Sequence, residues 1–186
     1  MKGTIRGAIL GVVIGATAAH PALAACDPEP PGVVIDYERF IEAPATAVDG
    51  DTILFNGSMI HLWGIDAPEP GQLCTKPDGE LWDCGERARA VLEALVGQRT
   101  VRCFFGGLKG SVDALGQQRA ICHSLGADGE QVSHLNQHVL SNGWAFADPC
   151  GSSSMYCDLE RRARERKNGI FSGDVMPPWD WRERGS

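Results

Sequence analysis

Three acidic residues in the first half of the chain have the type and spacing of a site for a hard cation. Asp51 lies in an Asp-Gly-Asp-Thr segment, and Asp66 and Glu69 lie in an Ile-Asp-Ala-Pro-Glu segment further along. A cation such as calcium prefers several oxygen ligands, which clustered carboxylates and a backbone carbonyl supply. A glutamate that is not fully committed to the ion can orient or deprotonate a water molecule. The pattern therefore predicts a calcium site beside a residue that can promote hydrolysis.

The elements that would position these carboxylates are predicted to be two short strands and a loop. Residues 52–55 are rich in β-forming side chains, the Asn-Gly pair at 56–57 is a strong hairpin signal, and residues 59–63 resume the strand. Gly50 in the preceding turn is expected to adopt a positive φ. Residues 66–83 are rich in Pro, Gly and acidic residues and are predicted to form a loop. The carboxylates should therefore meet where the strands end and this loop begins.

The rest of the chain has the pattern of a compact α+β domain. Three segments fit helices, at residues 85–96, 132–140 and 159–167. Residues 99–105 and 118–123 are predicted to be strands. About five strands with about three helices are compatible with a small closed β-barrel. The 186 residues suffice for one such domain with a proper core.

Residues 1–25 have the pattern of a secretory signal peptide. Lys2 and Arg6 precede an apolar stretch that is too short for a stable membrane span, and small residues follow it. Two cleavage patterns fit: ordinary signal peptidase, or a bacterial lipobox in which Cys26 is acylated. Residues 26–43 are predicted to be an N-terminal tether. We expect a periplasmic or secreted monomer without a transmembrane span after cleavage, either free or lipid-anchored at Cys26.

The seven cysteines indicate disulfide bonds rather than a metal site. With Cys26 set aside, six cysteines remain, and an oxidising compartment favours their pairing. Pairing in sequence order is the simplest connectivity: Cys74–Cys84, Cys103–Cys122 and Cys150–Cys157. Buried free thiols are the alternative. Zinc fits poorly, because no CxxC pair occurs.

The net charge of the chain is negative. Seventeen basic and 24 acidic residues give −7, and removal of Lys2 and Arg6 with the signal peptide leaves 15 basic residues and −9. Proteins that bind nucleic acid usually present an excess of Lys and Arg to the phosphates. The overall charge therefore counts against avid binding of polyanions.

The two acidic segments, residues 48–52 and 64–69, resemble the paired signature of the staphylococcal-nuclease-type (thermonuclease) family. The resemblance continues through residues 85–96 to a tryptophan-rich tail at 179–182, and covers roughly residues 44–182. It implies an OB-fold barrel that carries a calcium-dependent phosphodiesterase site. We therefore define residues 44–182 as the predicted domain.

The resemblance assigns roles to four residues. Asp51 and Asp66 match the metal-binding aspartates, Ala67 matches the position whose backbone carbonyl binds the metal, and Glu69 matches the glutamate that handles the attacking water. The alternative for the three carboxylates is a solvent-exposed acidic loop without a bound ion. For the neighbouring Asp49 we expect turn formation rather than ligation.

The two arginines that grip the phosphate in this family are replaced. His61 stands at one position and Gln117 at the other. Loss of one such donor typically costs about 10²–10³ in rate. His61 could substitute when it is protonated below neutral pH, and Arg119, two residues after Gln117, could reach back along a strand. An ordinary surface role for Arg119 is the competing interpretation.

Two functions of different classes follow. The first is a calcium-dependent phosphodiesterase (a nuclease) that acts on DNA or RNA outside the cytoplasm, with Glu69, His61 and Arg119 as its catalytic residues. The second is a catalytically impaired accessory protein of the cell envelope, for example in exopolysaccharide (succinoglycan) biosynthesis. A third, minor interpretation is that a partner supplies the missing arginine in trans.

Overall fold

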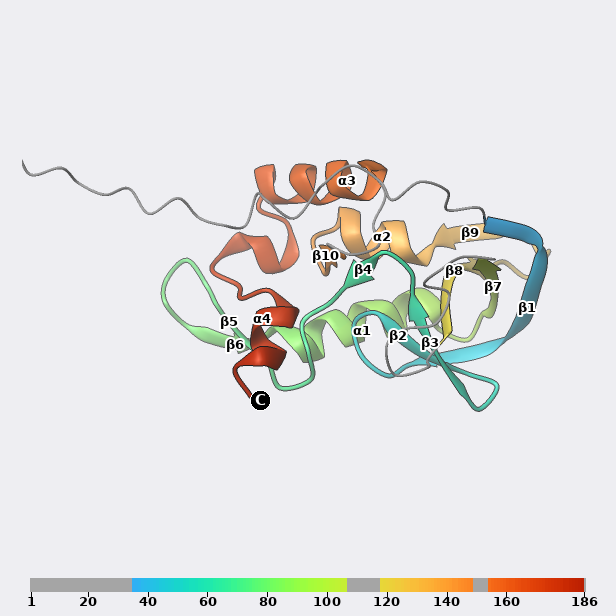
Figure 1. Ribbon diagram of the computed structural model, residues 1–186, viewed down its shortest axis with the longest axis horizontal. Coiled ribbons are helices and arrows are strands. Elements are labelled where there is room, and N and C mark those ends of the chain that lie inside the picture. Colours follow the sequence, from blue (N-terminus) through green and yellow to red (C-terminus); the bar gives the residue numbers. More distant parts are fainter. Residues whose placement is uncertain (1–34, 107–117, 149–153, 186) are drawn as a thin grey trace, which may run out of the picture.

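The computed structural model describes residues 35–106, 118–148 and 154–185, and a closed ring of strands lies at one end of the molecule (Figure 1). The ring strands are β1 (Ile35–Ala47), β2 (Thr52–Phe55), β3 (Ser58–Leu62), β7 (Thr100–Gly106) and β8 (Gln118–Leu125). β1 pairs with β2, β2 with β3, β1 with β7 and β7 with β8, all in antiparallel fashion. A parallel pairing of β3 with β8 closes the ring. The predicted α+β class with an OB-like near-barrel is confirmed.

The hairpin of β2 and β3 forms as predicted. Asn56 and Gly57 have φ values of 48° and 81°, and positive φ at both central residues is what an Asn-Gly turn provides. Ile53 and Ile60 lie opposite each other across this hairpin, and both are fully buried. β1 differs from expectation, because it begins at Ile35, within the segment 26–43 that was predicted to be a tether.

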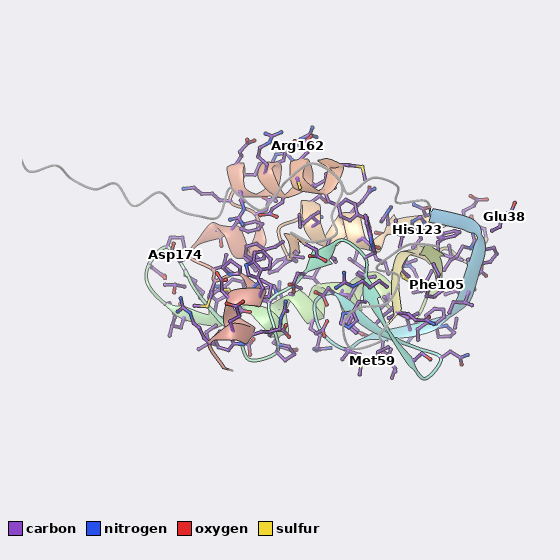
Figure 2. All side chains as sticks on the ribbon, in the orientation of Figure 1. Glu38, Met59, Phe105, His123, Arg162 and Asp174 are labelled. Atoms are coloured by element: carbon purple, nitrogen blue, oxygen red, sulfur yellow. A yellow bond between two sulfur atoms is a disulfide. The ribbon has the colours of Figure 1, made fainter. Side chains whose placement is uncertain are left out.

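The described parts of the chain contain five helical segments that follow or flank the ring: α1 (Cys84–Val96), α2 (Leu135–Ser141), α3 (Ser154–Glu165), the 3₁₀ helix η2 (Gly169–Ser172) and α4 (Pro178–Glu183). α1 confirms the predicted helix at 85–96, and Asp83 caps it by accepting a hydrogen bond from the backbone N–H of Glu86. α3 begins before the predicted start at Leu159 and carries exposed charged side chains on its outer face, Arg162 among them (Figure 2). α4 was not predicted.

The predicted helix at residues 132–140 is wrong in its first turn. Those residues belong to β9 (Gln131–His134), which pairs with β8 so that His134 lies opposite His123. Backbone pairing with the sheet takes precedence over the helical pattern there. α2 begins only at Leu135, and the Nδ1 atom of His134 accepts a hydrogen bond from the N–H of Gln137 at the start of the helix.

The predicted loop at residues 66–83 contains short strand pairings. β4 (Ile65–Asp66) pairs with β10 (Phe146–Ala147), and β5 (Leu73–Thr75) pairs with β6 (Leu81–Asp83). The Cys74–Cys84 disulfide then ties β5 to the first residue of α1. This segment is therefore held at both ends.

Two of the predicted disulfides are confirmed, Cys74–Cys84 and Cys103–Cys122. The second joins residues that lie opposite each other on β7 and β8. Cys157 is also disulfide-bonded, whereas its predicted partner Cys150 lies outside the described residues.

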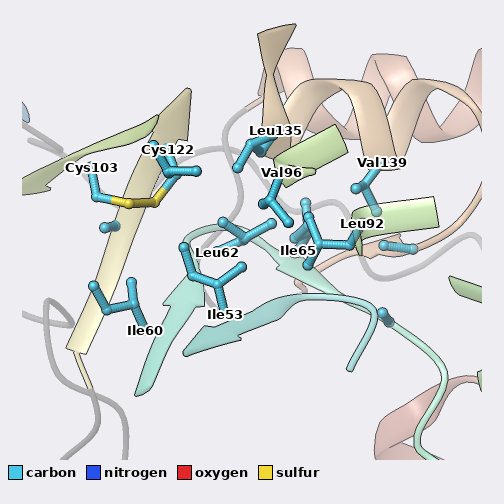
Figure 3. Packing of buried hydrophobic residues seen from close by; sticks show 14 of the residues in the cluster. Ile53, Ile60, Leu62, Ile65, Leu92, Val96, Cys103, Cys122, Leu135 and Val139 are labelled. Carbon is cyan, nitrogen blue, oxygen red and sulfur yellow. A yellow bond between two sulfur atoms is a disulfide. The ribbon is translucent and has the colours of Figure 1, made fainter. Parts of the chain in front are cut away.

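The main core fills the space between the ring and the helices. Figure 3 shows the side chains of Leu92 and Val96 from α1 and of Leu135 and Val139 from α2 pointing toward the strand residues, and all four are fully buried. A second cluster lies next to it, formed by Cys74, Cys84, Phe146, Ala163, Ile170 and Phe171. Trp179 packs against this second cluster, which seats the C-terminal segment beside β4 and β10.

A buried asparagine bonds to β8 at the point where its pairing changes from β3 to β9. β8 pairs with β3 up to Ala120 and with β9 from His123 onward. Between these pairings, Asn136 accepts a hydrogen bond from the N–H of Cys122 and donates to the carbonyl oxygens of Ala120 and Trp63. Its side chain therefore replaces missing strand contacts and joins α2 to the ring.

Candidate carboxylate site

Asp51 is held by the turn that leads into β2. Its Oδ2 accepts a hydrogen bond from the N–H of Ala67 at 2.7 Å, and its Oδ1 accepts one from the hydroxyl of Thr52 at 3.0 Å. Asp49 adopts the predicted turn role, because its Oδ1 accepts from the N–H of Asp51. These bonds orient the Asp51 carboxylate toward the start of the 66–83 segment.

Gly50 allows this close approach, although not through its φ. The expectation of a positive φ is wrong, since Gly50 is not among the residues with that conformation. A Cβ atom at this position would instead lie 2.6 Å from the Cβ of Ala67 and 2.8 Å from that of Ala88. The absence of a side chain lets the turn pack directly on the 66–83 segment and on α1.

Asp66 and Glu69 converge on an arginine that the sequence pattern did not single out. Nη1 of Arg182 donates to Asp66 Oδ1 at 3.0 Å, and Nη2 donates to Asp66 Oδ2 at 2.7 Å. Nη1 also donates to Glu69 Oε1. Arg182 lies on α4, in the tryptophan-rich tail that forms the end of the thermonuclease resemblance. That position in the tail is the one signal that could have directed attention to it.

His61 and Arg119 lie side by side in the register of β3 and β8. The Nδ1 of His61 is 3.0 Å from the hydroxyl oxygen of Thr52 and 3.8 Å from Asp51 Oδ1. Arg119 pairs with Asp148 at 3.1 Å. His61 therefore lies beside the Asp51 carboxylate, while the guanidinium of Arg119 is directed to a different acid. The turn at residues 113–116 and Gln117 lie outside the described residues.

Burial sets the electrostatics of the site. It raises the pKa of Asp51 to about 7, helped by the charges of Asp49 and Asp66 and opposed by the hydrogen bond with His61. Burial also raises the pKa of Asp66, against the lowering effect of Arg182. The hydrogen bonds to Asp66 and Glu69 raise the pKa of Arg182, so its guanidinium stays charged.

The side chains as arranged do not fit a calcium ion. Within the described parts of the chain, no group of three or more His, Cys, Asp and Glu side chains is placed to hold a metal. Both oxygens of Asp66 and one of Glu69 face Arg182. The bond from Ala67 to Asp51 comes from its backbone N–H. The metal and catalytic roles given to Asp51, Asp66, Ala67, Glu69, His61 and Arg119 therefore stay predictions.

Comparison with known proteins gives one direction for the function. No protein-family model matches the chain. The chain is 30% identical over 128 residues to the succinoglycan biosynthesis protein ExoI of Rhizobium meliloti (strain 1021). The two proteins are distant homologues. The aligned region is 68% of this chain and spans 62% of the relative's length.

The covalent structure bears on where the protein resides. The disulfides at Cys74–Cys84 and Cys103–Cys122 indicate an oxidising, extracytoplasmic compartment. Among the described residues, no helix is long and apolar enough to cross a membrane.

Proposed function

We propose that this protein is an exported accessory protein of exopolysaccharide biosynthesis, of the succinoglycan type. The observation that carries the proposal is its homology to a succinoglycan biosynthesis protein. The disulfides support it, because polysaccharide export and processing take place at the cell envelope, where disulfides persist.

The contacts of the site favour an accessory role over phosphodiester hydrolysis. The charges of Asp66 and Glu69 are balanced by Arg182, and Arg119 is held by Asp148. A phosphoryl-transfer site needs preorganised cations that face the position of the phosphate. The excess of acidic over basic residues also opposes binding of a polyanionic substrate.

Deletion of the gene in its native host tests the proposal. We expect the deletion strain to secrete less exopolysaccharide, or polysaccharide of altered chain length, and expect a plasmid copy of the gene to restore the normal product. An unchanged amount and chain length in the deletion strain would contradict the proposal.

A phosphodiesterase is the second candidate, and one observation favours it. Asp51, Asp66 and Glu69 lie in one region of the molecule. Asp51 accepts a hydrogen bond from the N–H of Ala67, the neighbour of Asp66, and Arg182 bonds to both Asp66 and Glu69. The thermonuclease resemblance leads to the same expectation. The test is cleavage of single-stranded DNA by the purified protein with calcium, with Glu69→Gln as the control. Cleavage that the control lacks would support this candidate, and equal background in both proteins would reject it.

A further inference from the structure

Arg182 engages Asp66, one of the predicted calcium ligands, and Glu69, the predicted water-activating residue. It forms three hydrogen bonds to two carboxylates, a bidentate pair with Asp66 and one bond to Glu69. The planar guanidinium matches this arrangement, and bidentate charge-assisted bonds of this kind are among the strongest in proteins. Three carboxylate oxygens that a cation bound between Asp66 and Glu69 would use are therefore already engaged.

The position of Arg182 is set by packing around α4. Trp179, one turn earlier on the same helix, packs on Phe146 with ring centroids 5.4 Å apart. Phe146 lies opposite Asp66 in the pairing of β10 with β4. The helix that carries the arginine is thus anchored on the strand partner of the carboxylate that the arginine binds.

A buried glutamine links the second carboxylate to the same helix. Gln72 is fully buried, its Oε1 accepts from the N–H of Glu69 at 3.1 Å, and its Nε2 donates to the carbonyl of Met176 at 2.7 Å. Met176 lies two residues before Pro178, the buried first residue of α4. The backbone of Glu69 and the start of α4 therefore keep a fixed separation.

We propose that Arg182 is the built-in cation of this site and that, while α4 is docked, it excludes divalent cations from Asp66 and Glu69. The guanidinium neutralises the carboxylates of Asp66 and Glu69 without a bound metal ion. A calcium ion must displace it to reach the same oxygens. The inference concerns the ligand of the site and does not depend on the proposed role in polysaccharide production.

Calcium titration by calorimetry tests the proposal on the purified protein. Arg182 is half-exposed, so Arg182→Gln is expected to fold, which circular dichroism and the melting temperature check. Removal of the competing charge should let this variant bind calcium about tenfold or more tightly than the wild type. Arg184→Gln is the matched control, because it removes the same charge from the end of the same helix, and it should behave as the wild type.

A double variant locates the binding. Asp66→Asn together with Arg182→Gln should lose the calcium affinity that Arg182→Gln gains, because a carboxylate needed by the ion is gone. The proposal is overturned if a folded Arg182→Gln variant binds calcium no more tightly than the wild type. It is also overturned if Arg184→Gln gains affinity to the same extent, or if the double variant keeps it.

Discussion

At the scale of single residues, the side chain of Asn136 forms hydrogen bonds that a neighbouring strand would otherwise supply. Replacement by Ala leaves the N–H of Cys122 and the carbonyl of Trp63 without this partner, whereas the carbonyl of Ala120 keeps its hydrogen bond from the N–H of Trp63. Buried polar groups that lose their hydrogen bonds cost about 1–3 kcal/mol each. We therefore expect Asn136→Ala to lower the free energy of unfolding by about 3 kcal/mol or more in urea denaturation. The control Asn142→Ala changes an exposed residue, and a comparable small effect at both positions would contradict this view.

His134 gives the protein a predictable response to acid. Burial, with a smaller effect of the neighbouring His123, lowers its pKa to about 4. The unfolded side chain titrates near about 6.5, so between these values the unfolded state binds more protons, and stability falls as the pH is lowered. His134→Asn keeps a side chain that can cap α2 but removes the titration. From pH 7 to pH 5 the variant should lose about 2 kcal/mol less unfolding free energy than the wild type. Equal losses in urea denaturation would show that His134 does not carry this dependence.

At the scale of elements, local signals in the sequence sufficed where the structure is local. The Asn-Gly pair predicted the β2–β3 hairpin, and the apolar spacing with its following Gly97 predicted α1. β9 was taken for helix because its pairing with β8 is a tertiary contact that periodicity does not report.

In the carboxylate site, too, the sequence predicted the residues that are close in the chain and missed the one that is distant. The spacing of Asp51, Asp66 and Glu69 predicted that they would lie in one region. Arg182 could not be found in this way, because it is 116 residues from Asp66 in the sequence and reaches it only through the docking of α4.

The disulfide between β7 and β8 should be a main source of stability for the ring. It joins Cys103 and Cys122, 19 residues apart, and both are fully buried. Closure of a loop of this length is worth about 3 kcal/mol in the chain-entropy account. Replacing both cysteines by Ala should lower the free energy of unfolding by about that amount. A loss below about 1 kcal/mol in the double variant would contradict the expectation.

At the scale of the whole molecule, the protein is a disulfide-bonded OB-like domain in which Arg182 forms ion pairs with Asp66 and Glu69. If Arg182 excludes divalent cations from Asp66 and Glu69, as proposed above, calcium should add little to the free energy of unfolding. A ligand that binds the folded state and is present at about 100 times its Kd raises the free energy of unfolding by about 2.7 kcal/mol, whereas a ligand that does not bind leaves it unchanged. We therefore expect the Tm of the wild type to be the same with about 10 mM calcium as with a chelator. A rise of several degrees with calcium in thermal denaturation would count against this description.

The proposal that the protein is a non-hydrolytic accessory of exopolysaccharide production is tested most directly by the polysaccharide that a complemented deletion strain secretes. The strain should carry either the wild-type gene or Glu69→Gln, which removes the carboxylate predicted to activate water. Both genes are expected to restore the amount and chain length of the polysaccharide to the same level. Restoration by the wild type alone, with the variant folded and exported, would contradict it.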